Sequence, residues 1–233
     1  MSETGSRESR PPVIAIDGPG GSGKGTISLR LARELGWNFL DSGALYRLVA
    51  LAAMNRGIEP NNEAALAELA SVLKAQFHMN EEGTRYVLDG EDVSEPLRSE
   101  AVSAFASHVA SQAAVREALV DRQRAFRQPP GLVADGRDMG TVIFPDAAHK
   151  IFLTASVEER AQRRYKQLKE KGEGVNLSRL FRDIEKRDQR DMSREIAPLV
   201  PADDAVTIDS TRLSVDEVIC AIYEVIENSG GSF

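Results

Sequence analysis

The chain has 233 residues, 42% hydrophobic and 28% charged, enough to bury a core as one domain or as one domain with an insertion. Its 29 basic and 36 acidic residues leave a formal net charge of −7, which argues against broad binding to nucleic acid or membranes. The single cysteine excludes an internal disulfide, and no stretch approaches the roughly 20 apolar residues of a membrane span. We therefore expect a cytoplasmic protein.

The first quarter of the chain alternates strand and helix patterns. The apolar run 13–16 is typical of a buried parallel strand, and a glycine-rich turn separates it from a helical pattern over 24–35. A second strand is expected at 38–40. Asp41-Ser42-Gly43 then offers a cap for a helix from Ala44 to about Arg56.

The sequence pattern changes from helical to strand-like after an alanine-rich helix expected over 62–72. The runs 76–79 and 85–88 flank Asn80-Glu81-Glu82-Gly83, which predicts a β-hairpin, and Asp89-Gly90 supplies another turn. We therefore expect a small antiparallel sheet within an inserted segment.

Strands and helices alternate again after this insertion. Helical patterns over about 101–126, in two pieces, end at Pro129-Pro130-Gly131. Further strands are expected at 132–134, 150–153 and 205–208, and further helices at 157–171, 177–192 and 215–228. Cys220 falls in the apolar helical period of the last helix, which predicts a packed thiol. The alternation indicates a three-layer α/β fold around a five-stranded parallel sheet.

The domain organisation follows from these patterns. The polar start, residues 1–12, predicts a disordered tail before a single domain at 13–233. Within that domain we expect a core at 13–62 and 104–233, an inserted subdomain at about 63–103, and a short lid at about 158–175.

A glycine-rich loop lies between the first strand and the first helix. It reads Gly18-Pro19-Gly20-Gly21-Ser22-Gly23-Lys24-Gly25-Thr26, and the strand, loop, lysine and helix are in the register of a phosphate-binding P-loop. Glycines let backbone N–H groups turn toward phosphate oxygens, and the helix N-terminus adds partial positive charge. Lys24 can reach the β- and γ-phosphates. Because Gly25 stands where Ser or Thr is common, Thr26 is the candidate for Mg²⁺, directly or through water.

Two other polar clusters follow predicted strands. They are 41–47, which includes Ser42, Tyr46 and Arg47, and 135–138, which includes Arg137 and Asp138. Ligands of open α/β sheets gather at the carboxyl ends of strands, so both clusters point to the crevice of the P-loop. Helix capping and a surface ion pair are the alternative interpretations.

Two helical patterns carry arginines at helical spacing. Arg187, Asp191 and Arg194 share one helix face, and Arg160, Arg163 and Arg164 precede a break at Gly172 and Gly174. Either set fits phosphate binding, the second as a moving lid, and either also fits a solvated, salt-bridged surface.

Taken together, these strings resemble bacterial cytidylate kinases from Val13 to about Glu227. The matching pieces are GPGGSGKGT, LDSGALYR, VREAL, DGRDMGTVIFP, ERAQRR, KRDQRDMSR and APLVPADDA. The resemblance implies transfer of the γ-phosphoryl of ATP to CMP or dCMP with Mg²⁺ by a monomer. From the net charge we expect no nucleic-acid or membrane partner. The inserted segment at about 63–103 also resembles the nucleotide-monophosphate domain of that family.

The resemblance also implies residue roles. The P-loop residues would bind ATP, and the acceptor phosphate would be held by Ser42, Arg47, Arg137 and Arg194. Asp138 and Arg116 would contact the cytosine ring, Arg187 and Asp191 the ribose, and Arg160 and Arg164 would face the transferred group from the lid. Tyr46 is a further candidate for substrate binding. The catalytic candidates are Lys24, Arg137, Arg160, Arg164 and Arg194.

Some alternatives remain open at this point. Counting back nine residues from Arg116 gives Ser107 as a further contact to the base, although a similar local string brings Ser111 forward. The competing functions are a P-loop kinase for another nucleoside monophosphate and a nonenzymatic nucleotide-binding regulator.

Overall fold

A computed structural model of the chain describes residues 10–80, 83–170, 172 and 174–228. Residues 1–9 of the predicted tail lie outside these ranges. The backbone carbonyls of Pro11 and Pro12 accept hydrogen bonds from Arg127 Nε (2.6 Å) and from the Leu132 N–H (3.0 Å). The chain is therefore attached to the domain just before its first strand.

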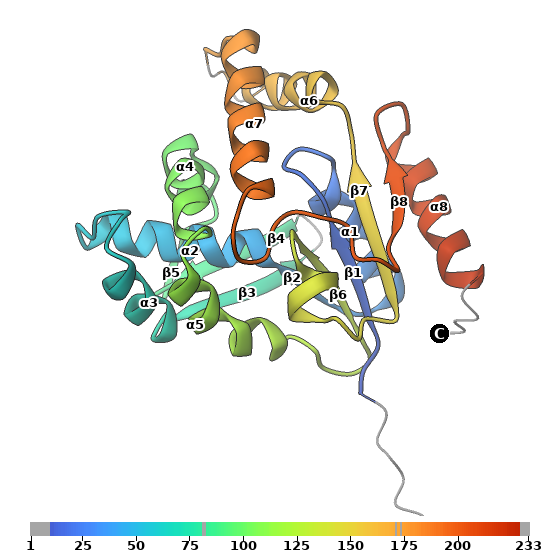
Figure 1. The fold of residues 1–233 in the computed structure, drawn as a ribbon, viewed down its shortest axis with the longest axis horizontal. Coiled ribbons are helices and arrows are strands. Elements are labelled where there is room, and N and C mark those ends of the chain that lie inside the picture. The colour runs from blue at the N-terminus through green and yellow to red at the C-terminus, as the bar shows by residue number, and fades with distance from the viewer. Residues whose placement is uncertain (1–9, 81–82, 171, 173, 229–233) are drawn as a thin grey trace, which may run out of the picture.

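The predicted five-stranded parallel sheet is confirmed. Its strand order is β2-β6-β1-β7-β8, and each neighbouring pair is parallel. The strands are β1 (Val13–Asp17), β2 (Asn38–Asp41), β6 (Leu132–Gly136), β7 (His149–Thr154) and β8 (Val206–Asp209). The central strand β1 lies between β6 and β7 (Figure 1). It is buried along its whole length, as its apolar run 13–16 requires.

Helices cover both faces of this sheet. On one face Ile14 and Ile16 of β1 pack against α1 (Lys24–Leu35) and α8 (Val215–Asn228). On the other, Val13 and Ala15 pack with Leu45 of α2 (Ser42–Asn55). Successive side chains of a strand point to opposite faces, so one apolar strand serves both layers and the three-layer architecture follows.

The segment after α2 forms the predicted hairpin and a second core. A three-stranded antiparallel sheet, β3-β4-β5, lies in this segment, and residues 81–82 of the predicted turn lie outside the described ranges. Its elements are α3 (Glu63–Ser71), β3 (Ala75–Asn80), β4 (Gly83–Leu88), β5 (Glu91–Asp92), η1 (Pro96–Arg98), α4 (Glu100–Val109) and α5 (Ala113–Arg124). One apolar cluster joins α2, α3, β4, α4 and α5, so the inserted segment shares its core with α2. The boundaries of core, insertion and lid stay a prediction.

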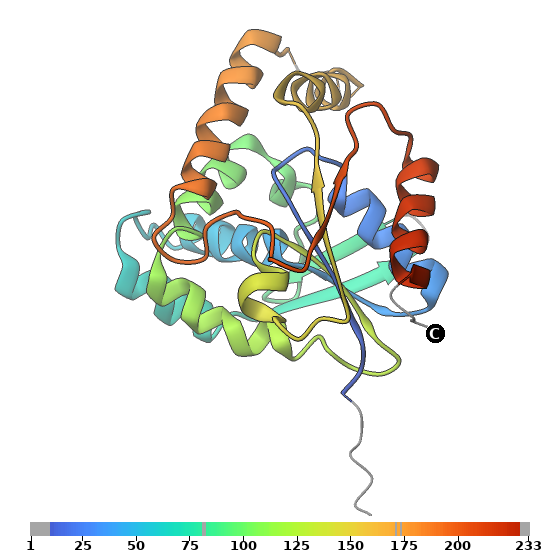
Figure 2. The same cartoon turned by 45° about the vertical axis from the view of Figure 1, so that its right-hand side comes forward.

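Two helices rise beyond the carboxyl ends of the strands. They are α6 (Val157–Glu170) and α7 (Leu177–Met192), drawn in yellow-orange and orange at the top of Figures 1 and 2. Their placement over the strand ends suits elements that cover a ligand site. No helix in the described part of the chain is long and apolar enough to cross a membrane.

Two features differ from the sequence-based expectations. A π-helical turn, η2 (Met139–Ile143), follows β6, in a stretch for which we predicted no element. The thiol of Cys220 is exposed, so the prediction of a packed thiol was wrong. Val218, Ile219 and Ile222 form the buried stripe of α8, and position 220 lies on the opposite side of the helix.

Candidate functional site

The P-loop takes the backbone shape that its glycines permit. Gly21 and Gly23 have φ values of 82° and 96°, which side chains other than glycine rarely adopt. A Cβ on Gly18 would lie 2.0 Å from the carbonyl oxygen of Leu153 on β7. Residues 20–26 line a cavity of about 920 Å³. The loop therefore presents its backbone to a space that can hold a nucleotide.

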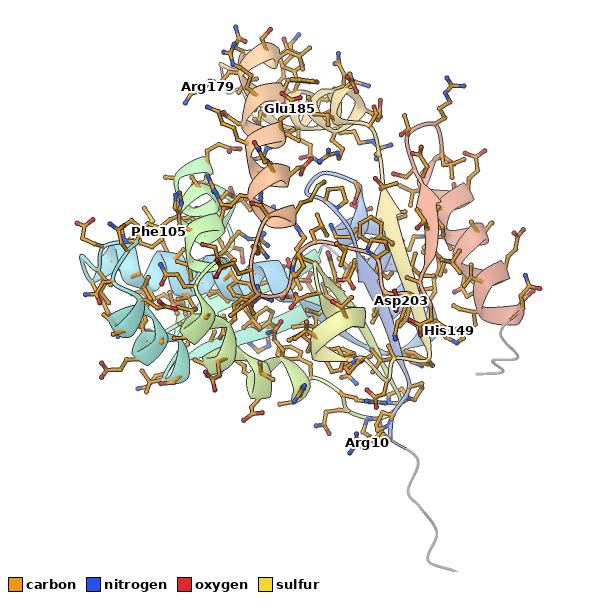
Figure 3. The ribbon with its side chains drawn as sticks, in the orientation of Figure 1. Arg10, Phe105, His149, Arg179, Glu185 and Asp203 are labelled. Carbon is orange, nitrogen blue, oxygen red and sulfur yellow. The ribbon has the colours of Figure 1, made fainter. Side chains whose placement is uncertain are left out.

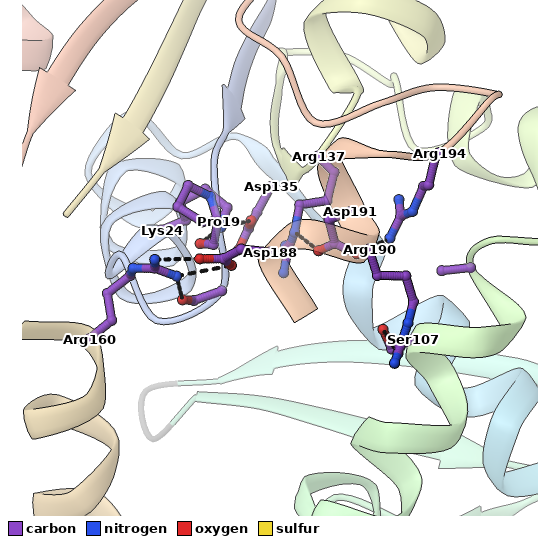
Figure 4. A network of polar contacts seen from close by, with 12 residues as sticks. Pro19, Lys24, Ser107, Asp135, Arg137, Arg160, Asp188, Arg190, Asp191 and Arg194 are labelled. Carbon is purple, nitrogen blue, oxygen red and sulfur yellow. Dashed lines mark hydrogen bonds and ion pairs between the residues drawn. The ribbon is translucent and has the colours of Figure 1, made fainter. Parts of the chain in front are cut away.

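Lys24 is the buried cation of this loop. Its side chain is 5% exposed, and its Nζ donates a hydrogen bond to the Pro19 carbonyl (2.9 Å) and lies 3.9 Å from Oδ1 of Asp135 (Figure 4). Burial, helped by Arg137, lowers the pKa of Lys24 to about 8, against the opposing attraction of Asp135. Burial also raises the pKa of Asp135 to about 6, with Lys24 opposing it.

Arginines from three elements surround the loop. A Cβ on Gly20 would lie 3.3 Å from Arg137 Nη2 and 3.7 Å from Arg187 Nη1. Arg163 of α6 also contacts the loop, with Nη1 3.3 Å from the Ser22 carbonyl oxygen. Arg137 follows β6 and Arg187 lies on α7, so tertiary folding collects positive charge from distant parts of the chain.

Two predicted lid arginines have partners in this structure. Arg160 forms a two-pronged ion pair with Asp188 of α7 and donates to the Gly20 carbonyl (3.0 Å) (Figure 4). It thereby ties α6 to α7 beside the P-loop. Arg164 instead pairs with Glu100, the first residue of α4, and both residues line the large cavity.

A second cavity, of about 40 Å³, adjoins the first. Gly43, Arg47, Arg137 and Arg187 line both. All ten residues predicted to bind the acceptor line the small cavity: Ser42, Tyr46, Arg47, Ser107, Arg116, Arg137, Asp138, Arg187, Asp191 and Arg194. Ser111, the alternative to Ser107, is exposed and donates to the His108 carbonyl oxygen (2.7 Å).

A buried ion pair forms one wall of the small cavity. Arg116 pairs with Asp138, and the two residues are 6% and 2% exposed. Arg116 also donates to the Ala110 carbonyl (3.0 Å) and lies 5.5 Å from the centre of the Tyr46 ring. A fixed carboxylate and a fixed guanidinium at this depth can read the polar edge of a ligand.

The Asp17 carboxylate holds the turn that carries Asp138. The two carboxylate oxygens of Asp17 accept the N–H groups of Met139 and Gly140, each at 2.8 Å. Burial raises the pKa of Asp17 to about 7, while the two backbone hydrogen bonds lower it. Asp17 is the last residue of β1, so it links the start of the P-loop to the turn that carries Asp138 into the small cavity.

Arg187 and Asp191 share one face of α7 and line the small cavity, as predicted. Arg194, predicted on the same helix face, lies beyond Met192, where the helix ends, but it lines the same cavity. Asp191 accepts from Arg137 Nε (3.1 Å) and from Arg194. Burial acts to raise the pKa of Asp191, but Arg137, Arg194 and Arg187 outweigh it and hold that pKa below its usual value. Burial and the nearby Arg137 lower the pKa of Arg187 to about 10, so Arg187 is charged at neutral pH. A bound anion would satisfy this excess of positive charge.

Sequence reasoning missed several partners. Asp188, Glu100, Asp17 and Arg190 were not assigned, although each contacts a predicted site residue or its turn. Arg190 and Asp188 had a signal, since they lie inside the charged string that carries Arg187 and Asp191. Glu100 and Asp17 had none, because only tertiary folding brings them to the site.

The oxygen groups near Lys24 suit a magnesium ion held mainly by nucleotide and water. Thr26 is exposed to the large cavity, and Asp135 lines the same cavity. Hydroxyl and carboxylate oxygens are the hard ligands that Mg²⁺ prefers, with phosphates and water completing its shell. The described residues contain no cluster of three or more His, Cys, Asp or Glu that would form an all-protein metal site.

Known proteins are similar in sequence to this chain over nearly its whole length. The family described as cytidylate kinase matches residues 14–228. The cytidylate kinase of Stutzerimonas stutzeri (strain A1501) is 60% identical over 217 residues, covering 92% of this chain and 95% of that protein. That of Aeromonas salmonicida (strain A449) is 56% identical over 220 residues, covering 94% and 96%. The resemblance found in the motifs is confirmed, and the chain belongs to the cytidylate kinase family.

Proposed function

We propose that this protein transfers the γ-phosphoryl group of ATP to CMP or dCMP, giving ADP and CDP or dCDP. The observation that carries the proposal is the pair of adjoining cavities. One is built on the P-loop, the other on the buried Arg116–Asp138 pair, and Arg137 and Arg187 line both. Similar proteins named cytidylate kinase support the same conclusion.

The donor nucleotide would lie along the P-loop. Residues 18–26 would bind its phosphates through backbone N–H groups and the start of α1, and Lys24 would contact the β- and γ-phosphates. Arg160 already contacts the Gly20 carbonyl and Arg163 the Ser22 carbonyl. Both guanidinium groups are therefore close to where the phosphates would lie.

The acceptor phosphate would lie at the wall common to the two cavities. Ser42, Arg47, Arg137 and Arg194 would hold it, and Asp191 orients two of these arginines through its carboxylate. We expected Arg187 to contact the ribose with Asp191, but its guanidinium also lies beside Gly20 and so adds charge between the two phosphates. Phosphoryl transfer passes through a loose, highly charged transition state, which these groups would align and stabilise.

The chemistry needs no dedicated general base. The second pKa of a phosphate monoester is about 6, so the acceptor is already largely dianionic near pH 7. Water is the competing acceptor, and closure of the insertion and of the α6–α7 region over both nucleotides would exclude it. The contact between Arg164 and Glu100 joins those two regions across the large cavity.

Base selection would come from the buried pair. The Asp138 carboxylate can accept a hydrogen bond from the exocyclic amine of cytosine, while Arg116 and Ser107 donate to its ring acceptors. Uracil would place a carbonyl against that carboxylate. An unpaired buried polar group costs about 1–3 kcal/mol, so we expect uracil to be disfavoured about tenfold to a hundredfold.

Magnesium is part of the proposal. Thr26 and Asp135 would hold it with the nucleotide phosphates, directly or through water. When bound, the ion would neutralise phosphate charge and orient the γ-phosphoryl group. We also propose that the protein works in the cytoplasm as a monomer without nucleic-acid or membrane partners. Its single cysteine supports the cytoplasm, its acidic balance opposes nucleic-acid and membrane partners, and the family resemblance implies the monomer.

The test is ADP formation from ATP and Mg²⁺ with CMP, dCMP, UMP, AMP and GMP offered separately. Strong turnover with CMP and dCMP and weak turnover with the others is the expected result. Preferred turnover of AMP or GMP would favour a P-loop kinase for another nucleoside monophosphate. Tight ATP binding without turnover of any acceptor would favour the nonenzymatic regulator.

A further inference from the structure

The small cavity is lined by a serine whose hydroxyl is hydrogen-bonded to a residue outside the cavity. Ser107 of α4 is 5% exposed and lines the small cavity with Arg116 and Asp138. Its Oγ accepts a hydrogen bond from Arg190 Nη1 of α7 at 2.8 Å (Figure 4). Arg190 does not line the cavity. It therefore acts on the pocket through Ser107 rather than by contact with a ligand.

This contact determines whether the Ser107 hydroxyl acts as a hydrogen-bond donor or acceptor toward the cavity. A serine hydroxyl has one O–H to donate and two lone pairs to accept. The guanidinium of Arg190 can only donate, so it occupies a lone pair and leaves the O–H proton for another partner. Within the described part of the chain, that proton has no acceptor and the Arg190 side chain has no ion-pair partner. The pairing is thus dedicated, and it leaves Ser107 as a hydrogen-bond donor to the cavity.

We propose that Arg190 is a specificity-determining positioning residue that fixes Ser107 as a donor to the pyrimidine edge. The proposal rests on the proposed function. With Ser107 and Arg116 as donors and Asp138 as acceptor, the pocket complements a ring with one amine donor and two adjacent acceptors. Cytosine has that pattern, whereas uracil presents an N–H at the central position. A serine free to rotate would accept from that N–H, and Arg190 opposes this accommodation.

The same contact joins two ends of the acceptor site. Arg190 lies three residues after Arg187, so one helix carries the groups beside the phosphates and the group behind the base pocket. Ser107 and Arg190 are 83 residues apart in sequence, and α4 and α7 approach each other only in the folded protein (Figure 4).

The test compares CMP with UMP in Arg190→Met and Arg190→Lys. The matched control is Arg179→Met, which removes an exposed arginine from the outer end of α7 (Figure 3). We expect Arg190→Met to lower kcat/KM for CMP about tenfold, to leave that for UMP within about twofold, and to leave the KM for ATP unchanged. Arg190→Lys, which keeps a cationic donor, should recover part of the CMP preference, and Arg179→Met should match the wild type.

A double-mutant cycle with Ser107→Ala separates this mechanism from a structural effect. If Arg190 acts through Ser107, adding Arg190→Met to Ser107→Ala should change the CMP-to-UMP ratio less than about twofold. Multiplying effects, or equal losses with CMP and UMP in Arg190→Met, would overturn the proposal. Absence of CMP turnover in the wild type would instead overturn the proposed function, and that result is read before any variant is compared.

Discussion

The donor loop and the acceptor pocket are built in different ways. Nine consecutive residues, 18–26, form the donor loop, and their backbone shape and one buried lysine determine its chemistry. The acceptor pocket takes side chains from α2, α4, α5, the end of β6 and α7, and ion pairs hold them in place. A loop that binds phosphates through its backbone depends little on the side chains around it. A pocket that recognises a base depends on the position of each of its side chains. The two regions should therefore fail separately.

Replacing Lys24 should give the largest effect and should damage only the donor side. Lys24→Met removes the buried cation nearest the phosphates, and we expect kcat to fall about a thousandfold, as for loss of a preorganised charge at a transferring group. The dissociation constant for CMP without ATP should change less than about threefold. Calorimetry measures that constant, and Lys74→Met, at an exposed lysine, is the control. A large loss of CMP affinity would show that the two regions are not independent.

Replacing Asp138 should damage only the acceptor side. Asp138→Asn keeps the size of the side chain but exchanges one oxygen acceptor for an amide donor. We expect kcat/KM for CMP to fall about a hundredfold and the CMP-to-UMP ratio to fall with it, because the amide can donate to the uracil carbonyl. The KM for ATP should stay unchanged. Asp203→Asn, at an exposed aspartate on the loop before β8, is the control (Figure 3).

The pH should affect the two regions differently. The pKa of Lys24 is lowered to about 8, so the lysine is charged below that pH and neutral above it. ATP affinity should therefore weaken by up to about tenfold per pH unit above 8. CMP affinity, held by arginines, should not follow this step. Titration of each nucleotide alone between pH 6.5 and 9.5 measures both, and parallel curves would contradict the assignment.

The contact between α4 and α6 should matter least. The Glu100 and Arg164 side chains are 59% and 32% exposed, and an ion pair in such a position contributes at most about 1 kcal/mol. Glu100→Gln should shift the melting temperature by no more than about 2–4 °C and change kcat/KM for CMP less than about threefold, with a smaller difference at high salt. A tenfold loss of kcat with normal KM values would instead make this pair part of the closing motion.

Local pattern was enough for most of the elements. The bounds of α1, α7 and α8 agree with the predicted helical patterns, and the five parallel strands agree with short apolar runs. Short elements escaped prediction. η1, β5 and η2 carry too few residues for a period, and η2 depends on the Asp17 carboxylate, which lies 122 positions before the N–H of Met139. Cys220 was misplaced because an apolar residue inside an amphipathic helix need not lie on its buried stripe.

The sequence by itself determined the donor loop, because strand, glycines, lysine and helix are neighbours along the chain and local backbone geometry joins them. The resemblance also predicted ten acceptor-binding residues, and all ten line one cavity. Only the tertiary structure decided how those residues are paired: Arg116 with Asp138, Arg160 with Asp188, and Ser107 with Arg190. The partners in these pairs are 22, 28 and 83 residues apart, and hydrogen bonds over such separations depend on the packing of whole helices rather than on local spacing.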